Sequence, residues 1–175
     1  EFINTNDFNF KRTNQKGLNF DNLNKKIISG FIKLKNKKNK DEVLKINDLD
    51  QVKIGCIVAV RLKSSRLKNK ALLKIGNLSS IELCLKNCLS LNRINNVVMA
   101  TSNLKEDKIL SNYTYDKRVV FYEGDPNNVI NRYLSIINKL DIDIFLRVTG
   151  DMPYISNDIF SYLLESHFRA GADYT

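Results

Sequence analysis

The chain has 175 residues, enough for one domain and a small second one, and its formal net charge is +9. No apolar run reaches the roughly 20 residues that a membrane-spanning helix needs, so we expect no membrane partner. The basic charge alone could suit nucleic acid, but no zinc-finger, helix-turn-helix or RNA-binding motif accompanies it, so a solvated lysine-rich surface is favoured and no nucleic-acid partner is expected.

Residues 1–50 differ in composition from the rest of the chain. Brief apolar pieces alternate there with Asn, Lys and Gly, a pattern typical of short strands and turns. A segment of about 50 residues forms only a small hydrophobic core by itself, so this part is expected to pack against a neighbouring domain. Because the chain begins at Glu1 and ends without a stop-like tail, we expect both ends to be truncated from a longer polypeptide.

From Val52 onward, apolar runs alternate with helical patterns. Strands are predicted over residues 53–60, 96–100, 119–122 and 143–148. Helices are predicted to begin at Ser79 with a capping box, at Asn103, at Asp125–Pro126 and at Asn157. The alternation predicts a three-layer α/β domain with a mostly parallel sheet over residues 52–175. Ligands in such sheets bind beyond the carboxyl ends of the strands.

Cysteine and histidine usage excludes several kinds of site. The three cysteines are too few and too scattered for a disulfide framework, and Cys84 and Cys88, which share a helix face, are expected to be buried thiols. His167 is the only histidine, which excludes a His-based triad and a multi-histidine metal site. We expect it at a surface or packing position of the last helix.

A cationic loop follows the first buried strand. Arg61, Arg66 and Lys70 stand among serines and small residues there. Guanidinium groups bind phosphate oxygens bidentately and lysine adds a mobile point charge, so the loop suits a polyphosphate. It is neither a Walker A loop nor a dinucleotide fingerprint. The alternative is an ordinary basic surface loop, but its position at a strand end favours function.

Three further strand ends carry polar residues. After the fourth strand, Asp151 lies in a tight turn and could hold Mg²⁺ against substrate phosphates or only cap backbone amides. Thr101 and Ser102 follow the second strand, and their hydroxyl groups could form hydrogen bonds with a nucleotide base or cap a helix. Arg132, one turn into the helix after Gly124, could reach a ligand or only the surface.

These motifs together resemble the cytidylyltransferase-like sugar nucleotidyltransferases, the group of spore-coat polysaccharide biosynthesis proteins and of deoxy-octulosonate and acylneuraminate cytidylyltransferases. Residues 61–70 resemble their Arg-x-x-Ser-x-Arg-Leu-Pro-x-Lys loop, with Lys68 in place of proline. Residues 98–102 resemble Val-Val-Ala-Thr-Ser, and residues 147–153 resemble Arg-Ile-Thr-Gly-Asp-Cys-Pro. Residues 124–133 resemble Gly-Ser-x-x-Asp-Val-Leu-x-Arg-Tyr, with Asn128 in place of aspartate.

The resemblance implies a nucleotide-diphospho-sugar transferase-like (Rossmann-like) fold and transfer of CMP from CTP to a sugar acid, with release of pyrophosphate. It implies that Arg66 and Lys70 act on the triphosphate and that Asp151 holds Mg²⁺. Arg132 would contact the sugar, and the enzyme would be a cytoplasmic homodimer. Nucleotide-binding residues would be Ala59, Val60, Arg61, Leu62, Ser64, Thr101 and Ser102.

Residues 1–50 resemble the antifreeze-like (SAF) domain that ends sialic acid synthases, through residues 1–12 and 40–49. That resemblance implies that Arg12 lies near the amino-sugar substrate of a partner subunit. We therefore expect part of a synthase–cytidylyltransferase fusion in surface-glycan biosynthesis. The alternative is a non-catalytic sugar- or nucleotide-binding module.

Overall fold

The computed structural model describes residues 25–27, 31–34, 52–64, 67–170, 172 and 175. Its main feature is a six-stranded sheet in the order β1-β2-β8-β3-β6-β7. The four strands from β8 to β7 run parallel, and β1 and β2 continue the sheet antiparallel at the β8 edge. The strands are β1 (Lys25–Ile27), β2 (Phe31–Leu34), β3 (Ile54–Ala59), β6 (Asn96–Ser102), β7 (Val119–Gly124) and β8 (Ile144–Thr149). The predicted parallel α/β sheet is confirmed.

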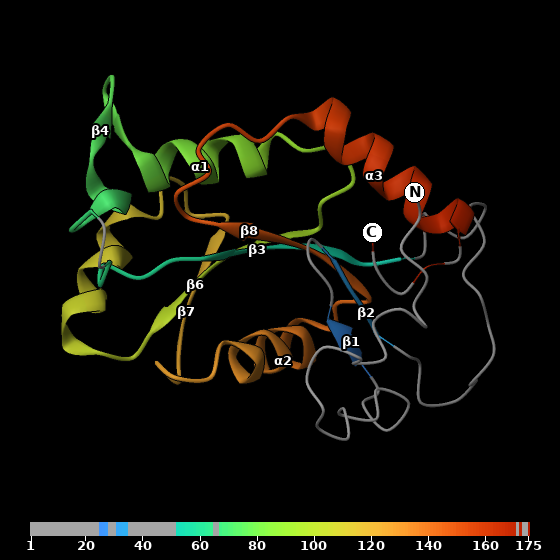
Figure 1. Ribbon diagram of the computed structural model, residues 1–175, viewed down its shortest axis with the longest axis horizontal. Coiled ribbons are helices and arrows are strands. Elements are labelled where there is room, and N and C mark those ends of the chain that lie inside the picture. Colours follow the sequence, from blue (N-terminus) through green and yellow to red (C-terminus); the bar gives the residue numbers. More distant parts are fainter. Residues whose placement is uncertain (1–24, 28–30, 35–51, 65–66, 171, 173–174) are drawn as a thin grey trace, which may run out of the picture.

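Helices cover both faces of this sheet (Figure 1). Helices α1 (Ser80–Leu89) and α3 (Asn157–Ala170) lie on one face, and α2 (Val129–Leu140) lies on the other. Each face has its own apolar core, and alternate residues of β3 enter them: Cys56 and Val58 pack on the α1 side, and Ile57 packs on the α2 side. Burial on both faces explains why the parallel strands read as continuous apolar runs.

Helix starts show where local sequence signals are reliable. The capping box at the start of α1 is confirmed, because the Ser79 hydroxyl accepts from the Glu82 N–H and the Glu82 carboxylate accepts from the Ser79 N–H. The start predicted at Asp125 is wrong. Asp125 accepts instead from the N–H of Asn127 in a local turn, and Asn128 caps α2 through the N–H of Asn131.

The segment after β6 also departs from the prediction. It is the 3₁₀ helix η4 (Lys105–Tyr113), whose N-cap is Leu104 rather than Asn103. Two short elements fill the stretch between β3 and α1: η3 (Lys70–Leu72), and a hairpin of β4 (Lys74–Ile75) and β5 (Leu78–Ser79). Gly76 turns the hairpin with a φ of 64°, a conformation that favours glycine.

The cysteines and the histidine are inside the molecule. Cys56, Cys84 and Cys88 are free and fully buried, as predicted for the helix pair. A hydrogen bond with Cys88 and burial raise the pKa of Cys84, and a hydrogen bond with Cys56 and burial raise the pKa of Cys88. His167 is 2% exposed and contacts the ring of Phe168 edge-on, so of the two positions predicted for it the packing one holds.

The first 50 residues are described only in β1 and β2. Strand β2 pairs antiparallel with β8, with Ile32 opposite Phe145, so this segment adds two strands to the sheet. The rest of the segment, including Arg12, lies outside the described residues. The SAF-like assignment and the boundary between residues 50 and 52 stay predictions. Within the described ranges, no helix is long and apolar enough to cross a membrane.

Candidate functional site

The carboxyl ends of the parallel strands form one edge of the sheet. The register places Ala59 beside Ala100 and beside Thr149, so the loops after β3, β6 and β8 begin side by side. From β3 the chain moves outward through β6 to β7 and then returns to β8 on the other side of β3. This reversal is a topological switch point, the place where ligands bind in open α/β sheets.

Backbone contacts pack the loops after β3 and β8 tightly against the sheet. The Val60 N–H donates to the Ala100 carbonyl at 3.1 Å, and the Gly150 N–H donates to the Ala59 carbonyl at 2.9 Å. A Cβ atom at Gly150 would lie 2.7 Å from the Cβ of Val60. Glycine is therefore required where the two loops meet.

The first residues of the cationic loop form hydrogen bonds with two other segments of the molecule. The exposed Arg61 donates through Nη1 to the carbonyl of Pro126 at 2.7 Å, which ties the loop to the segment before α2. The side chain of Leu62 enters the core, and its N–H donates to Oδ1 of Asp107 at 2.8 Å. Ser64 is partly exposed, and its hydroxyl accepts from the N–H of Leu67 at 3.4 Å.

Lys70 and Asp151 form an ion pair across the switch point. The Nζ atom of Lys70 lies 2.5 Å from Oδ2 of Asp151, although the two residues are 81 positions apart in the sequence. The hydrogen bond from Lys70 holds the pKa of the Asp151 carboxyl below its ordinary value, a bond from Thr149 adds to this, and partial burial opposes it. Asp151 is therefore an ionised carboxylate at neutral pH.

Arg132 is a buried arginine whose guanidinium is only partly paired within the described residues. It is 3% exposed, and among the described residues Nε and Nη1 have no hydrogen-bond partner. Its stem lies against the end of β7, where a Cβ at Gly124 would be 2.6 Å from the Arg132 Cγ. Burial lowers the Arg132 pKa and the charge of Arg61 lowers it further, while Asp107 and Asp125 oppose the shift. Such a site favours an anionic ligand.

The two hydroxyls after β6 have different surroundings. Thr101 is fully buried, and its Oγ1 has no hydrogen-bond partner in the described part of the chain. Ser102 is also buried, donates its hydroxyl proton to the carboxylate of Asp107, and accepts from the N–H of Leu104. The Thr101 hydroxyl is thus unpaired within the described residues, whereas the Ser102 hydroxyl is engaged by Asp107.

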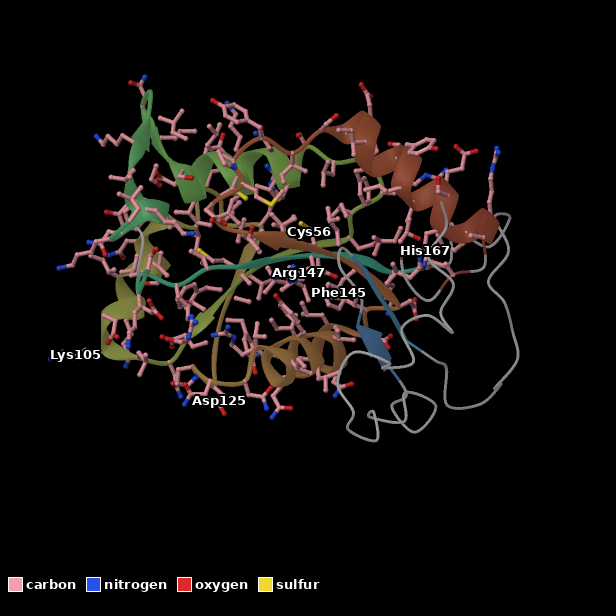
Figure 2. All side chains as sticks on the ribbon, in the orientation of Figure 1. Cys56, Lys105, Asp125, Phe145, Arg147 and His167 are labelled. Atoms are coloured by element: carbon pink, nitrogen blue, oxygen red, sulfur yellow. The ribbon has the colours of Figure 1, made fainter. Side chains whose placement is uncertain are left out.

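Arg147 shows that the α2 side of the edge is also polar. Figure 2 shows Phe145 and Arg147 on the side of β8 that faces α2. Arg147 is exposed, and its Nε donates to the hydroxyl of Tyr133 at 3.3 Å. Its motif was recognised in the sequence, but no site role was predicted for it.

The structure gathers most of the predicted residues at this edge. Ala59, Val60, Arg61, Leu62, Ser64, Lys70, Thr101, Ser102, Arg132 and Asp151 lie on the loops and elements at the carboxyl ends of the four parallel strands. The predicted Arg66 lies outside the described residues, as does Arg12.

Asp107 is the residue of this region that the sequence analysis missed. It is 1% exposed and lies three positions before the fully buried Leu110 in η4. Side chains three apart share one face of a 3₁₀ helix, so this spacing could have placed Asp107 on the inner face.

The donor set at this edge fits a magnesium ion bound together with a nucleotide. Within the described ranges, no group of three His, Cys, Asp or Glu residues could hold a metal. Magnesium typically takes one or two carboxylates and fills its other positions with phosphate oxygens and water. Asp151, ionised and 42% exposed at a strand end, is a carboxylate of this kind.

Comparison with known proteins identifies the family. Residues 55–175 match the family model described as Cytidylyltransferase. The chain belongs to the cytidylyltransferase family. It is 25% identical over 123 residues to the spore coat polysaccharide biosynthesis protein SpsF of Bacillus subtilis strain 168, covering 68% of this chain and 51% of that protein. The chain thus spans about half the length of this curated relative.

Solved structures share the cytidylyltransferase fold. A cytidylyltransferase from Leptospira borgpetersenii serovar Hardjo-bovis superposes with a TM-score of 0.62 and 28% identity, over 66% of this chain and 48% of that one. A CMP:2-keto-3-deoxy-manno-octonic acid synthetase complexed with CTP gives a TM-score of 0.57 and 22% identity, over 69% and 49% of the two chains. This second likeness concerns the fold alone. The resemblance to this family is confirmed over residues 55–175.

Proposed function

We propose that this protein is a cytidylyltransferase that transfers CMP from CTP to a hydroxyl of a sugar acid and releases pyrophosphate, in the synthesis of a surface polysaccharide. The family match and the similarity to SpsF support this. The observation that carries it is the pairing of Lys70 with Asp151 at the β3/β8 switch point. A cation for phosphate and a carboxylate for a metal meet there, next to the cationic loop.

The triphosphate of CTP would lie along the loop after β3. In the proposed reaction the sugar hydroxyl forms a bond to the α-phosphorus and loses its proton to solvent, and the bond from that phosphorus to the bridging oxygen breaks. Negative charge then develops on the departing pyrophosphate, where Lys70 and Arg66 would stabilise it. Without nucleotide, Lys70 is neutralised by Asp151. Binding of CTP would exchange this carboxylate partner for phosphate oxygens.

We propose that Asp151 also holds Mg²⁺. Bound there with the triphosphate, magnesium would neutralise phosphate charge and polarise the phosphoryl group. Without nucleotide, the hydrogen bond from Lys70 lowers the pKa of Asp151 and holds its carboxylate charged. Once Lys70 turns to the phosphates, Asp151 is free for this role.

The remaining groups of the edge would hold the two organic parts of the substrates. The cytidine would lie against the backbone of residues 59–62, with the unpartnered Thr101 hydroxyl as one hydrogen-bonding group. Arg132 would bind the carboxylate of the sugar acid, because its guanidinium is buried and two of its nitrogens have no partner among the described residues. A carboxylate supplies both the charge and the acceptors that this guanidinium needs.

Wider assignments rest on the sequence resemblance. We propose that residues 1–50 belong to an SAF-like domain whose Arg12 contacts an amino sugar, and that the chain is part of a fusion with an upstream synthase. That synthase would make the sugar acid, of the sialic-acid type, that the cytidylyltransferase then activates. We propose a cytoplasmic homodimer as the working form.

The test is release of pyrophosphate by the full-length protein given CTP, Mg²⁺ and either deoxy-octulosonate or N-acetylneuraminate. We expect release by the wild type and by Asp158→Ala, a control that removes an exposed carboxylate of α3. We expect Asp151→Ala to release almost none. Undiminished release by Asp151→Ala would refute its role, and no release by the wild type with either sugar acid would refute the proposed function.

A further inference from the structure

Asp107 is a buried carboxylate that joins two strand ends. It lies in η4, is 1% exposed, and uses its two oxygens on different partners. Oδ1 accepts the N–H of Leu62, which is 45 residues away in the loop after β3, at 2.8 Å. Oδ2 accepts the hydroxyl of Ser102 at the end of β6. One side chain thus fixes both the loop proposed to hold CTP and the strand next to it.

These contacts act on the backbone of the loop and not on a surface group. The Leu62 N–H is a buried donor, and a carboxylate forms a stronger hydrogen bond with it than a neutral acceptor would. Arg61, the preceding residue, is tied at its other end to the Pro126 carbonyl. Movement at Leu62 would therefore carry Arg61 with it, and with Arg61 the start of the cationic loop.

Asp107 also bears on the charge of the site. It attracts Arg132, and this attraction counteracts the lowering of the Arg132 pKa by burial and by Arg61. Its bond with Ser102 takes up the hydroxyl proton that would otherwise be free for a nucleotide. The carboxylate therefore holds part of the proposed site in place while remaining covered itself.

We infer that Asp107 is a positioning residue of the nucleotide site: its carboxylate fixes the Leu62 backbone and so positions Arg61 and Leu62, the start of the loop that receives the triphosphate. The inference rests on the proposed function for the identity of the ligand. Asp107 touches neither CTP nor the sugar. Its effect reaches the ligand through Leu62 and Ser102.

Calorimetric titration of CTP with Mg²⁺ into Asp107→Ala and Asp107→Asn tests this. We expect Asp107→Ala to raise the Kd for CTP about 10- to 100-fold, the factor found when the hydrogen-bond partners that orient metal ligands are removed. Asp107→Asn keeps a carbonyl oxygen for the Leu62 N–H and should recover most of the affinity. Recovery through the conservative variant is a result that general loss of stability does not give.

Leu110→Ala is the matched control. It removes a fully buried side chain from the same 3₁₀ helix but leaves both Asp107 contacts in place. We expect a lower Tm and an unchanged Kd for CTP. Equal loss of CTP affinity in Leu110→Ala and Asp107→Ala would overturn the inference, as would wild-type affinity in Asp107→Ala.

Amide hydrogen exchange at Leu62, followed by NMR without nucleotide, separates this inference from the proposed function. Exchange should be faster in Asp107→Ala than in Leu110→Ala, because only the first variant loses the acceptor of that N–H. Faster exchange together with no CTP binding by the wild type would refute the proposed function alone. Equal exchange in the two variants would refute the positioning contact itself.

Discussion

Arg132→Met should stabilise the ligand-free protein while it weakens ligand binding. The wild-type guanidinium is 3% exposed, with two nitrogens that have no partner in the described part of the chain. Each buried donor without a partner costs about 1–3 kcal/mol, so two cost about 2–6 kcal/mol. Methionine keeps most of the volume of the stem and carries no donor. Loss of the attraction to Asp107 and Asp125 offsets part of the gain.

The net gain expected for Arg132→Met is about 1–3 kcal/mol, because the relief of two unpaired buried donors exceeds the lost attraction to the two aspartates. In a chain of this size each kcal/mol corresponds to about 2–4 °C in Tm. Differential scanning calorimetry without ligand should therefore show a higher Tm than the wild type. Lys139→Met, an exposed change on the same helix, should alter stability by less than about 0.5 kcal/mol.

Ligand binding should change in the opposite direction. The Kd for the sugar acid, titrated in the presence of CTP and Mg²⁺, should rise in Arg132→Met and stay unchanged in Lys139→Met. A lower Tm for ligand-free Arg132→Met, combined with wild-type affinity for the sugar acid, would refute the reasoning. Arg132 would then be a structural residue and not a binding group held at a cost to stability.

Three further changes test local features of the fold and site. Gly150→Ala should destabilise the protein by about 1–3 kcal/mol in urea unfolding, because its methyl group would lie 2.7 Å from the Val60 Cβ; an unchanged midpoint would contradict that packing. Asn128→Ala should cost about 0.5–2 kcal/mol through loss of the α2 cap, and a neutral result would argue against the cap. Lys70→Met should raise the pKa of Asp151 toward its ordinary value in an NMR titration. In the wild type, the depressed pKa of Asp151 contributes folding stability that is present above the unfolded-state pKa of about 3.9 and is lost as the pH falls through the folded-state pKa. Lys70→Met should lack this contribution and its loss in acid. Identical pH profiles of unfolding stability for the wild type and Lys70→Met would contradict the ion pair.

The sheet was predictable because its signals are local. Buried parallel strands read as unbroken apolar runs, and the four predicted runs correspond to β3, β6, β7 and β8. The Ser79 cap was predictable because both partners of its capping box lie within one turn. The start of α2 was not predictable, because Asp125 and Asn128 are both suitable N-cap residues. In the structure Asp125 forms a local turn with Asn127, and Asn128 is the cap.

The site was predictable only in part, since its key contacts join distant residues. The positions of Lys70 and Asp151 after buried strands indicated phosphate and metal chemistry for each, but nothing in the sequence paired them with each other. The contact of Asp107 with Leu62 spans 45 residues and depends on how η4 packs beside β6. Arg132 was recognised beside an apolar stripe, but its burial depends on the close approach of its stem to Gly124, which the sequence does not show.

Titration of CTP into the protein in the presence of Mg²⁺ tests the central claim most directly. If the β3/β8 switch point is a nucleotide site, the wild type should bind one CTP per chain in a saturable way. Binding should weaken in Lys70→Ala and in Asp151→Ala. No binding heat and no rise in Tm at millimolar CTP would contradict the account, as would equal affinity in the wild type and both variants.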